Sequence, residues 1–330
     1  MFRIAKTIII ILCIGAVVFT AGANAGWAQQ AREENKKLQL TVGIIATLEE
    51  LPIVLSKKET TMPLNKIDLK LEVFNSWTAL EAAFRTGMVD AAGITVLKAF
   101  KMQLDNVPMK LVLFLHRKGS SLVFSQETTP ENLKGKLIGV SGNDTNQVLV
   151  LERFLEQKGL KLGYDVRYIL VPFRRAVALM KEEKIAGFVL PEPYGVMALA
   201  EPDLVKDYIL GKDIMPEGID VVLIINPKKI EENRAAIAEW ISSIVKSGAY
   251  IEEDKRKTAG EQVSLIQQDI LNIDPTLMQK ALGNNIQAID YSDLYPNISD
   301  LEKVMKKGLS LDILSGVVKL SDVVDTSFTR

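Results

Sequence analysis

The chain has few of the residues that carry most protein chemistry. Its 330 residues include one cysteine and one histidine. Cys13 lies in an N-terminal apolar run, so loss of that run leaves no disulfide, thiol nucleophile or cysteine metal ligand. His116 has no H-x-x-x-H spacing, and a zinc site needs several ligands. We therefore expect no metal site, no cofactor, no catalytic residues and no enzyme activity.

The chain also lacks an excess of charge and the common nucleotide motifs. Its net charge is −1, and no Lys/Arg-rich run stands out. Nucleic-acid binding is therefore not expected. No G-x-S-x-G, Walker or dinucleotide fingerprint is present. With 48% hydrophobic and 25% charged residues, the composition is that of a globular protein with one large core or two modest ones.

The N-terminus has the three parts of a signal peptide. Arg3 and Lys6 precede an apolar run over 7–23, and small residues follow at Ala23-x-Ala25 and Gly26-x-Ala28. This order predicts a signal peptide over 1–28 and a periplasmic or extracellular protein. An uncleaved anchor is the alternative, because the run is nearly long enough to span a thin bilayer.

Strand and helix patterns alternate along the rest of the chain. We expect strands at 38–45, 68–74, 89–94, 109–116, 122–125, 166–171 and 219–225, and helices at 48–57, 96–104, 231–251, 255–270 and 300–307. This alternation predicts an α/β protein with mostly parallel sheets. The same alternation of strands and helices repeats over 132–194, which indicates a second α/β lobe. We expect lobe 1 over 38–122 and 220–330, lobe 2 over 123–219, and a hinge near Leu122 and Val222.

The segment 75–95 is the clearest local unit. Ser76 stands at a helix N-cap, and Gly87 stands just past the end of the same helix. An apolar run over 89–94 then reads as a strand covered on both faces. Free N–H groups at such a helix start suit a polar or anionic ligand group, although ordinary capping explains them as well.

Several segments together resemble the periplasmic substrate-binding proteins of ABC importers, of the nitrate/sulfonate/taurine type that includes binders of thiamine's pyrimidine precursors. These are T-L-E-E-L-P-I (47–53), A-A-F-R-T-G-M-V-D-A-A (82–92), H-R-K-G-S (116–120), L-K-G-K-L-I-G-V (133–140) and P-E-P-Y (191–194). The resemblance implies a two-lobed type II periplasmic-binding-protein fold with two hinge crossings. The chain departs from the family's G-x-I-D-A pattern, since Glu183 replaces the glycine and Ala186 the aspartate.

Ligands of α/β sheets bind at the carboxyl ends of the strands, which selects the loops that could hold one. The candidate ligand-binding residues are Thr47, Ser76, Trp77, Thr95, His116, Ser120, Ser141, Asn143, Thr145, Phe173, Arg174, Glu192 and Tyr194. Trp77 could stack on a flat ligand or pack at a lobe edge. His116 could bond a ligand or be a polar strand-end residue.

The resemblance implies a monomer that captures a small polar ligand by hinge closure and delivers it to the permease and ATPase of an ABC importer. The aromatic residues with Glu192 favour a pyrimidine-like heterocycle. His116, Arg174 and the helix N-termini favour a nitrate-, sulfonate- or taurine-like anion. A sensor ectodomain with the same fold is the other alternative.

Overall fold

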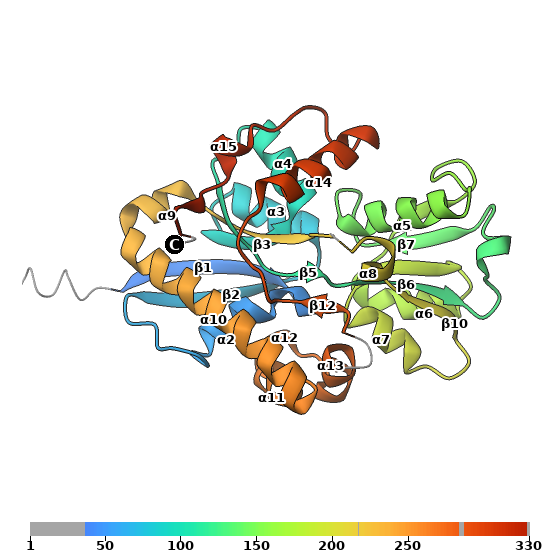
Figure 1. Ribbon diagram of the computed structural model, residues 1–330, viewed down its shortest axis with the longest axis horizontal. Coiled ribbons are helices and arrows are strands. Elements are labelled where there is room, and N and C mark those ends of the chain that lie inside the picture. Colours follow the sequence, from blue (N-terminus) through green and yellow to red (C-terminus); the bar gives the residue numbers. More distant parts are fainter. Residues whose placement is uncertain (1–36, 217, 284–286, 329–330) are drawn as a thin grey trace, which may run out of the picture. The chain divides into compact units, whose positions relative to one another are not determined.

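The computed structural model describes residues 37–216, 218–283 and 287–328. The expected signal peptide and Cys13 lie outside these residues. Two five-stranded sheets carry the fold (Figure 1). Both belong to one compact unit that begins at Gln39. No helix in the described part of the chain is long and apolar enough to cross a lipid bilayer.

The first sheet has the order β2-β1-β3-β11-β4. Its strands are β1 (Leu38–Ile45), β2 (Ile67–Phe74), β3 (Ala91–Thr95), β4 (Lys110–Phe114) and β11 (Val221–Ile225). β1 and β3 are parallel, whereas β11 runs antiparallel to both β3 and β4. β3 and β11 are buried along their whole length, as their continuous apolar sequences require.

The second sheet has the order β10-β6-β9-β7-β8. Its strands are β6 (Ser120–Ser125), β7 (Leu137–Val140), β8 (Arg167–Leu170), β9 (Gly187–Pro191) and β10 (Val205–Leu210). β7 is parallel to β8 and β9, but β6 is antiparallel to β9 and β10. Both sheets are therefore mixed. The expectation of mostly parallel sheets is wrong at β6 and β11, the two strands that follow a crossing between the sheets.

The two crossings lie side by side. The first is 115–119, which contains β5 (Arg117–Lys118), and the second follows α8 (Gly211–Ile214). Leu115 N donates to Val221 O at 3.0 Å, and Lys118 N donates to Gly218 O at 2.8 Å. β12 (Ile289–Asp290) pairs with β5 as a third segment. The expected hinge positions Leu122 and Val222 lie just beyond, inside β6 and β11. The lobe boundaries and the hinge motion stay predictions.

The structure confirms the helix N-cap and the glycine turn that were predicted within 75–95. α3 (Trp77–Arg85) begins after Ser76, whose Oγ accepts from Ala79 N at 3.2 Å. At its other end Gly87 has φ +75°, and Met88 N donates to Ala83 O at 2.9 Å. This six-to-one bond over a left-handed glycine is a Schellman ending. It turns the chain sharply into β3.

The helices beside the sheets begin at the loops that follow strands. The first sheet carries η1 (Leu48–Glu50), α2 (Leu51–Lys57) and α4 (Val96–Leu104), and the second carries η2 (Pro130–Asn132), α5 (Asn146–Gln157), η3 (Phe173–Arg175), α6 (Ala176–Lys181) and α7 (Tyr194–Leu199). The predicted helix 96–104 is confirmed. Glu183 follows α6 with φ +55°, so it adopts the left-handed conformation that favours the glycine of the family pattern.

The C-terminal helices differ from the two expected at 231–251 and 255–270. The chain forms α9 (Pro227–Glu232), α10 (Arg234–Thr258), α11 (Glu261–Ile266) and α12 (Gln268–Leu271), then α13 (Pro275–Leu282), α14 (Ile298–Ser310), α15 (Leu320–Val323) and η4 (Thr326–Phe328). The acidic run at 252–254 lies inside α10 because Asp254 is buried and accepts from Val263 N at 3.0 Å. The break comes instead at Ala259 and Gly260, both with positive φ. α10 packs on α2, and α14 packs on α4.

Candidate ligand-binding site

A cavity of about 190 Å³ lies where loops of both sheets meet, at the carboxyl ends of β1, β2, β8 and β9. Its lining residues are Ile45, Ala46, Phe74, Asn75, Pro172, Phe173, Arg174 and Tyr194. We call it the aromatic cavity. Its position agrees with the rule that α/β sheets bind ligands beyond the carboxyl ends of their strands. Three of the predicted site residues, Phe173, Arg174 and Tyr194, line it.

Aromatic side chains form one wall of this cavity. The rings of Phe173 and Tyr194 stack at 5.3 Å with 22° between their planes, and Trp77 meets Phe173 edge-on at 6.2 Å. Tyr194 Oη donates to Ala46 O at 3.2 Å and so links the second sheet to the loop after β1. Burial raises the pKa of Tyr194 to about 12, so its hydroxyl keeps its proton at neutral pH.

A chain of hydrogen bonds extends from Trp77 into the interior. Trp77 Nε1 donates to Ser141 Oγ at 3.2 Å, and Ser141 Oγ donates to Gln147 Oε1 at 2.8 Å. The Gln147 amide nitrogen donates to Ser120 Oγ at 3.2 Å and also to Asp220. Trp77 and Asp220 flank the first sheet, whereas Ser120, Ser141 and Gln147 belong to the second. The chain therefore holds the loops of the two sheets together.

The loop 141–145 makes a second tie. Thr95 Oγ1 donates to Asp144 O at 2.6 Å, and Lys98 Nζ lies 2.9 Å from Asp144 Oδ2. Thr145 Oγ1 donates to Gly142 O at 2.9 Å, within the loop. Asn143 is exposed at the tip. Asp144 is thus neutralised by Lys98 rather than open to a ligand.

Three carboxyl groups and the histidine lie buried together below the loop after β1. We call Glu49, Glu50, Asp220 and His116 the carboxyl cluster; all four side chains are fully buried. Burial raises the pKa of Glu49, that of Glu50 to about 8 and that of Asp220 to about 6. Desolvation by burial is the largest cause of each shift, and no lysine or arginine in the described chain pairs with these carboxyls to offset it.

His116 is the neutral partner in this cluster. Its Nε2 accepts from Val221 N at 3.1 Å, so the ring proton resides on Nδ1. Burial lowers the pKa of His116 to about 3. The contact of 3.4 Å between Nε2 and Glu49 Oε1 is therefore not an ion pair. Thr47 Oγ1 lies 3.4 Å from Glu49 Oε2, so Thr47 contacts the carboxyl cluster.

The carboxylate of Glu192 is directed into the second sheet. Tyr208 Oη donates to Glu192 Oε1 at 2.5 Å, and Val196 N donates to Oε2 at 3.1 Å. Burial raises the pKa of Glu192, and these donors lower it. Its backbone ties the sheets, since Leu48 N donates to Glu192 O at 3.0 Å.

The structure thus groups eleven of the thirteen predicted residues at four places. Phe173, Arg174 and Tyr194 line the cavity; Trp77, Ser120 and Ser141 form the hydrogen-bonded chain; Thr95, Asn143 and Thr145 flank Asp144; Thr47 and His116 lie at the carboxyl cluster. Ser76 caps α3, and Glu192 bonds Tyr208. Whether they bind a ligand stays a prediction.

Sequence reasoning missed Phe74, Asn75, Glu49, Glu50, Gln147 and Asp220. The adjacent glutamates directly after a buried strand were a usable signal for Glu49 and Glu50. Phe74 ends the expected second strand and Asn75 directly follows it, so their position was visible as well. Gln147 and Asp220 had no local signal, because only the fold brings them together.

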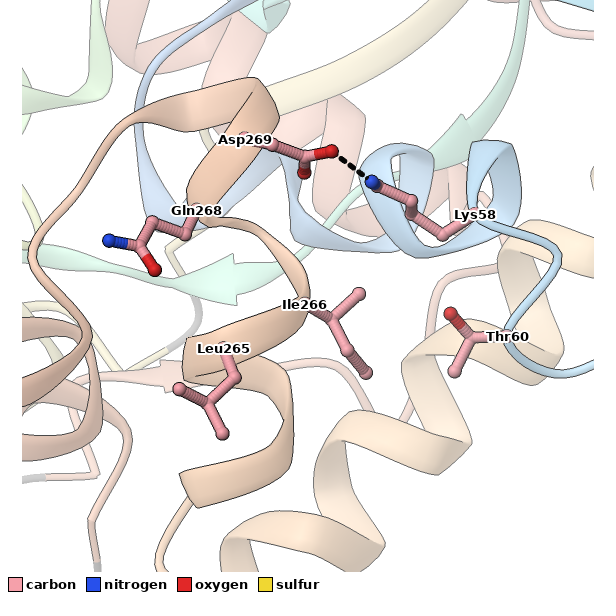
Figure 2. A pocket seen from close by; sticks show the side chains of 6 residues that line it. All are labelled: Lys58, Thr60, Leu265, Ile266, Gln268 and Asp269. Carbon is pink, nitrogen blue, oxygen red and sulfur yellow. Dashed lines mark hydrogen bonds and ion pairs between the residues drawn. The ribbon is translucent and has the colours of Figure 1, made fainter.

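A larger hollow of about 550 Å³ lies elsewhere, at Lys58, Thr60, Leu265, Ile266, Gln268 and Asp269. Figure 2 shows Lys58 and Asp269 joined as an ion pair, from the end of α2 and from α12. Leu265 is 56% exposed there. No predicted site residue lines this hollow. Within the described ranges, no group of three or more His, Cys, Asp or Glu side chains is arranged to hold a metal ion.

Solved structures share this fold over most of their length. A ligand-binding component of an ABC-type import system from Staphylococcus aureus, crystallised with zinc, has a TM-score of 0.79 at 18% identity and covers 88% of this chain and 98% of its own. The nitrate-binding protein NrtA from Synechocystis PCC 6803 has a TM-score of 0.76 at 13% identity, covering 89% and 88%. The alkanesulfonate-binding protein SsuA from Xanthomonas axonopodis pv. citri, bound to MOPS, has 0.71 at 14%, covering 88% and 99%.

These likenesses define the class of fold: a two-lobed α/β protein of the type II periplasmic-binding kind. The chain belongs to the NMT1-like family, which it matches over residues 33–267. The resemblance drawn from the sequence is confirmed at the level of family and fold. No curated protein sequence matches the chain.

Proposed function

We propose that this protein is an extracytoplasmic solute-binding protein that captures a small ligand and delivers it to the permease and ATPase of an ABC importer. The observation that carries the proposal is the aromatic cavity, which loops from both sheets line at the carboxyl ends of their strands. Family membership and the solved neighbours support it. The signal peptide over 1–28 and the monomeric state are parts of the same proposal.

Capture works by hinge closure. Backbone hydrogen bonds join the two crossings, from Leu115 to Val221 and from Lys118 to Gly218, so the crossings can bend together as one hinge. The ties Trp77–Ser141, Thr95–Asp144 and Tyr194–Ala46 span the two sides and would form as the lobes close. Closure removes water from the cavity and strengthens the few polar contacts made to a bound ligand.

Two ligand chemistries follow from the residues. A pyrimidine-like heterocycle fits the rings of Phe74, Phe173 and Tyr194 and remains the first proposal. A nitrate-, sulfonate- or taurine-like anion is the alternative, favoured by the guanidinium of Arg174 at the same cavity. The carboxyl of Glu192 bonds Tyr208 and Val196, so its contribution to heterocycle binding would require a change of partners.

A thermal-shift screen of the mature protein against both classes tests the function. A ligand at 100 times its dissociation constant adds about 2.7 kcal/mol of stability. Neither class producing a shift, with the protein folded by circular dichroism, would contradict capture of these ligands. Incubation of each hit followed by chromatography should return it unchanged, and repeated turnover would show an enzyme instead.

A variant at Trp77 tests whether this residue contributes to ligand binding or only to packing. Trp77 meets Phe173 edge-on and does not line the cavity, so Trp77→Ala should weaken a ring-bearing ligand through Phe173 by less than the roughly 1–3 kcal/mol of direct base–aromatic stacking, and should weaken a small anion less still. Truncation of this buried side chain also costs about 3–5 kcal/mol of stability, so the variant is checked by circular dichroism. Tyr164→Ala, at an 86% exposed tyrosine, is the matched control. Unchanged affinity in a folded Trp77→Ala variant would leave Trp77 as a packing residue.

A sensor ectodomain with the same fold is the second candidate. It would bind its ligand with the same cavity but would not support uptake. Neighbouring genes for a permease and an ATPase, and ligand uptake that stops when the gene is deleted, distinguish transport from sensing.

A further inference from the structure

The aromatic cavity combines aromatic rings, which suit a flat ligand, with a guanidinium, which suits an anion. Its lining holds three aromatic rings, Phe74, Phe173 and Tyr194, and one charged side chain, Arg174. Among the described residues, no aspartate or glutamate belongs to the lining. The apolar remainder comes from Ile45, Ala46 and Pro172. A cavity of this make-up fits a ligand that has both a flat apolar body and a negative group.

Arg174 has no acidic partner within the described ranges. Its neighbour Arg175 lies 3.3 Å from Glu182 and is thus neutralised, whereas no described carboxylate lies within ion-pair distance of Arg174. The Arg174 charge acts on the cavity itself, because it lowers the pKa of Tyr194 against the larger effect of burial. An unpaired guanidinium beside aromatic rings is the arrangement that recognises a planar acid bidentately.

The nearby acidic groups do not oppose an anion. The carboxyl cluster lies outside the lining, and Glu192 is directed toward Tyr208. Burial raises the pKa of Glu49, and that of Glu50 to about 8, which favours their neutral forms at neutral pH; Asp220, with a pKa of about 6, is ionised there but accepts from Asn146 N and the Gln147 amide. Asp144 is balanced by Lys98 and Lys101. Arg174 therefore sets the local charge that a ligand meets.

The cavity is small for a ligand site. Its volume of about 190 Å³ lies below the roughly 300–1,000 Å³ that ligand pockets commonly have, which favours a small ligand. One six-membered ring with one or two small groups fits it.

We propose that the aromatic cavity takes a single-ring aromatic acid, with the ring among Phe74, Phe173 and Tyr194 and the carboxylate or sulfonate on Arg174. This inference rests on the proposed function, since it names the solute class that the binding protein captures. It joins the ring and the anion in one ligand. Asn75, also in the lining, supplies an amide for a further substituent on the ring.

Titration calorimetry of the mature protein tests the inference with six probes: benzoate, benzenesulfonate, benzamide, uracil, nitrate and taurine. Benzamide has the shape of benzoate without its charge. We expect benzoate or benzenesulfonate to bind about 10- to 100-fold tighter than benzamide, the range of a charge-assisted hydrogen bond. Arg174→Gln should remove most of this preference, because it weakens the acids far more than benzamide, whereas Arg175→Gln should keep it.

Each contrary result has a distinct meaning. Benzamide or uracil binding as tightly as benzoate overturns the acid part of the inference, and the solute-binding function stands. Nitrate or taurine binding tighter than both ring acids overturns the ring part of the inference, and the solute-binding function again stands. An acid preference that survives Arg174→Gln also overturns the inference. If no probe binds, the inference is wrong, and the wider thermal-shift screen decides the proposed function separately.

Discussion

Replacing Glu50 by glutamine should change how the stability of this protein depends on pH. The Glu50 carboxyl is fully buried, its Oε1 accepts from Ile45 N at 3.4 Å, and its Oε2 has no hydrogen-bond partner among the residues that the structure describes. Burial raises its pKa from 4.5 to about 8. The folded protein therefore keeps a proton on Glu50 that the unfolded chain releases.

The sign of the effect follows from proton binding. Between the unfolded pKa of 4.5 and the folded pKa of about 8, the folded state holds more protons than the unfolded state, so stability falls as the pH rises. At about 1.4 kcal/mol per pKa unit, the cost is about 1 kcal/mol near pH 5 and about 4 kcal/mol near pH 7.5. Glu50 alone thus removes about 3 kcal/mol of unfolding free energy over that range.

Glutamine has nearly the shape of the protonated carboxyl and does not titrate. Glu50→Gln should match the wild type within about 1 kcal/mol near pH 5 and exceed it by about 3–4 kcal/mol near pH 7.5. Urea unfolding followed by tryptophan fluorescence at four pH values measures the difference. Glu49, Asp220 and Glu192 remain in both proteins, but Glu50 also raises the pKa of Glu49, so the difference curve reports Glu50 together with its coupling to Glu49. Glu72→Gln, at a surface carboxylate, is the control and should change little.

A difference curve that stays flat from about pH 5 to pH 8 would refute the reasoning, because the linkage relation requires a slope wherever the two pKa values differ. Glu50 would then be ionised in the folded protein, with a partner that compensates its burial. A glutamine variant that is less stable at every pH would mean that its amide lacks an acceptor at the Oε2 position. The slope of the curve, and not its offset, is the quantity that decides.

Four further outcomes are expected. Gly93→Ala should cost about 1–3 kcal/mol of stability, because a Cβ there meets the Glu50 carboxylate; urea unfolding should show part of the loss recovered in Gly93→Ala/Glu50→Ala. Lys307→Met removes ion pairs to Glu152 and Glu156 and should cost about 1 kcal/mol, less at high salt; equal loss at low and high salt would contradict an ionic origin. Mass spectrometry of the exported protein should place the mature N-terminus within 26–30, and an intact Met1 would indicate an anchor. Small-angle scattering should show a smaller radius of gyration with ligand than without, and identical curves at saturation would contradict closure.

Local chemistry made part of the fold readable from the sequence. The strand at 38–45, the helix at 96–104 and the cap and glycine ending around α3 depend on residues within a few positions of each other. Ser76 and Gly87 act on their own helix ends, so no distant contact is needed to predict them. The order of family segments from Thr47 to Tyr194 was enough for the family and the fold class.

The direction of the crossing strands was not readable in this way. β6 and β11 have the same apolar pattern whether they run parallel or antiparallel, and only the path between the two sheets decides it. The long helix α10 continues through 252–254 because Asp254 accepts a hydrogen bond from Val263 N and Lys255 Nζ donates one to Ile289 O. Without those partners, three acidic residues favour a helix boundary.

For the candidate site, the sequence determined which loops follow strands, and it placed Phe173, Arg174 and Tyr194 among the candidates. Tertiary structure decided the rest, because burial and pairing depend on neighbours that are distant in the chain. Only the fold joins Trp77 to Ser141, turns Glu192 toward Tyr208, pairs Lys98 with Asp144, and leaves Arg174 beside the aromatic cavity without a carboxylate partner among the described residues.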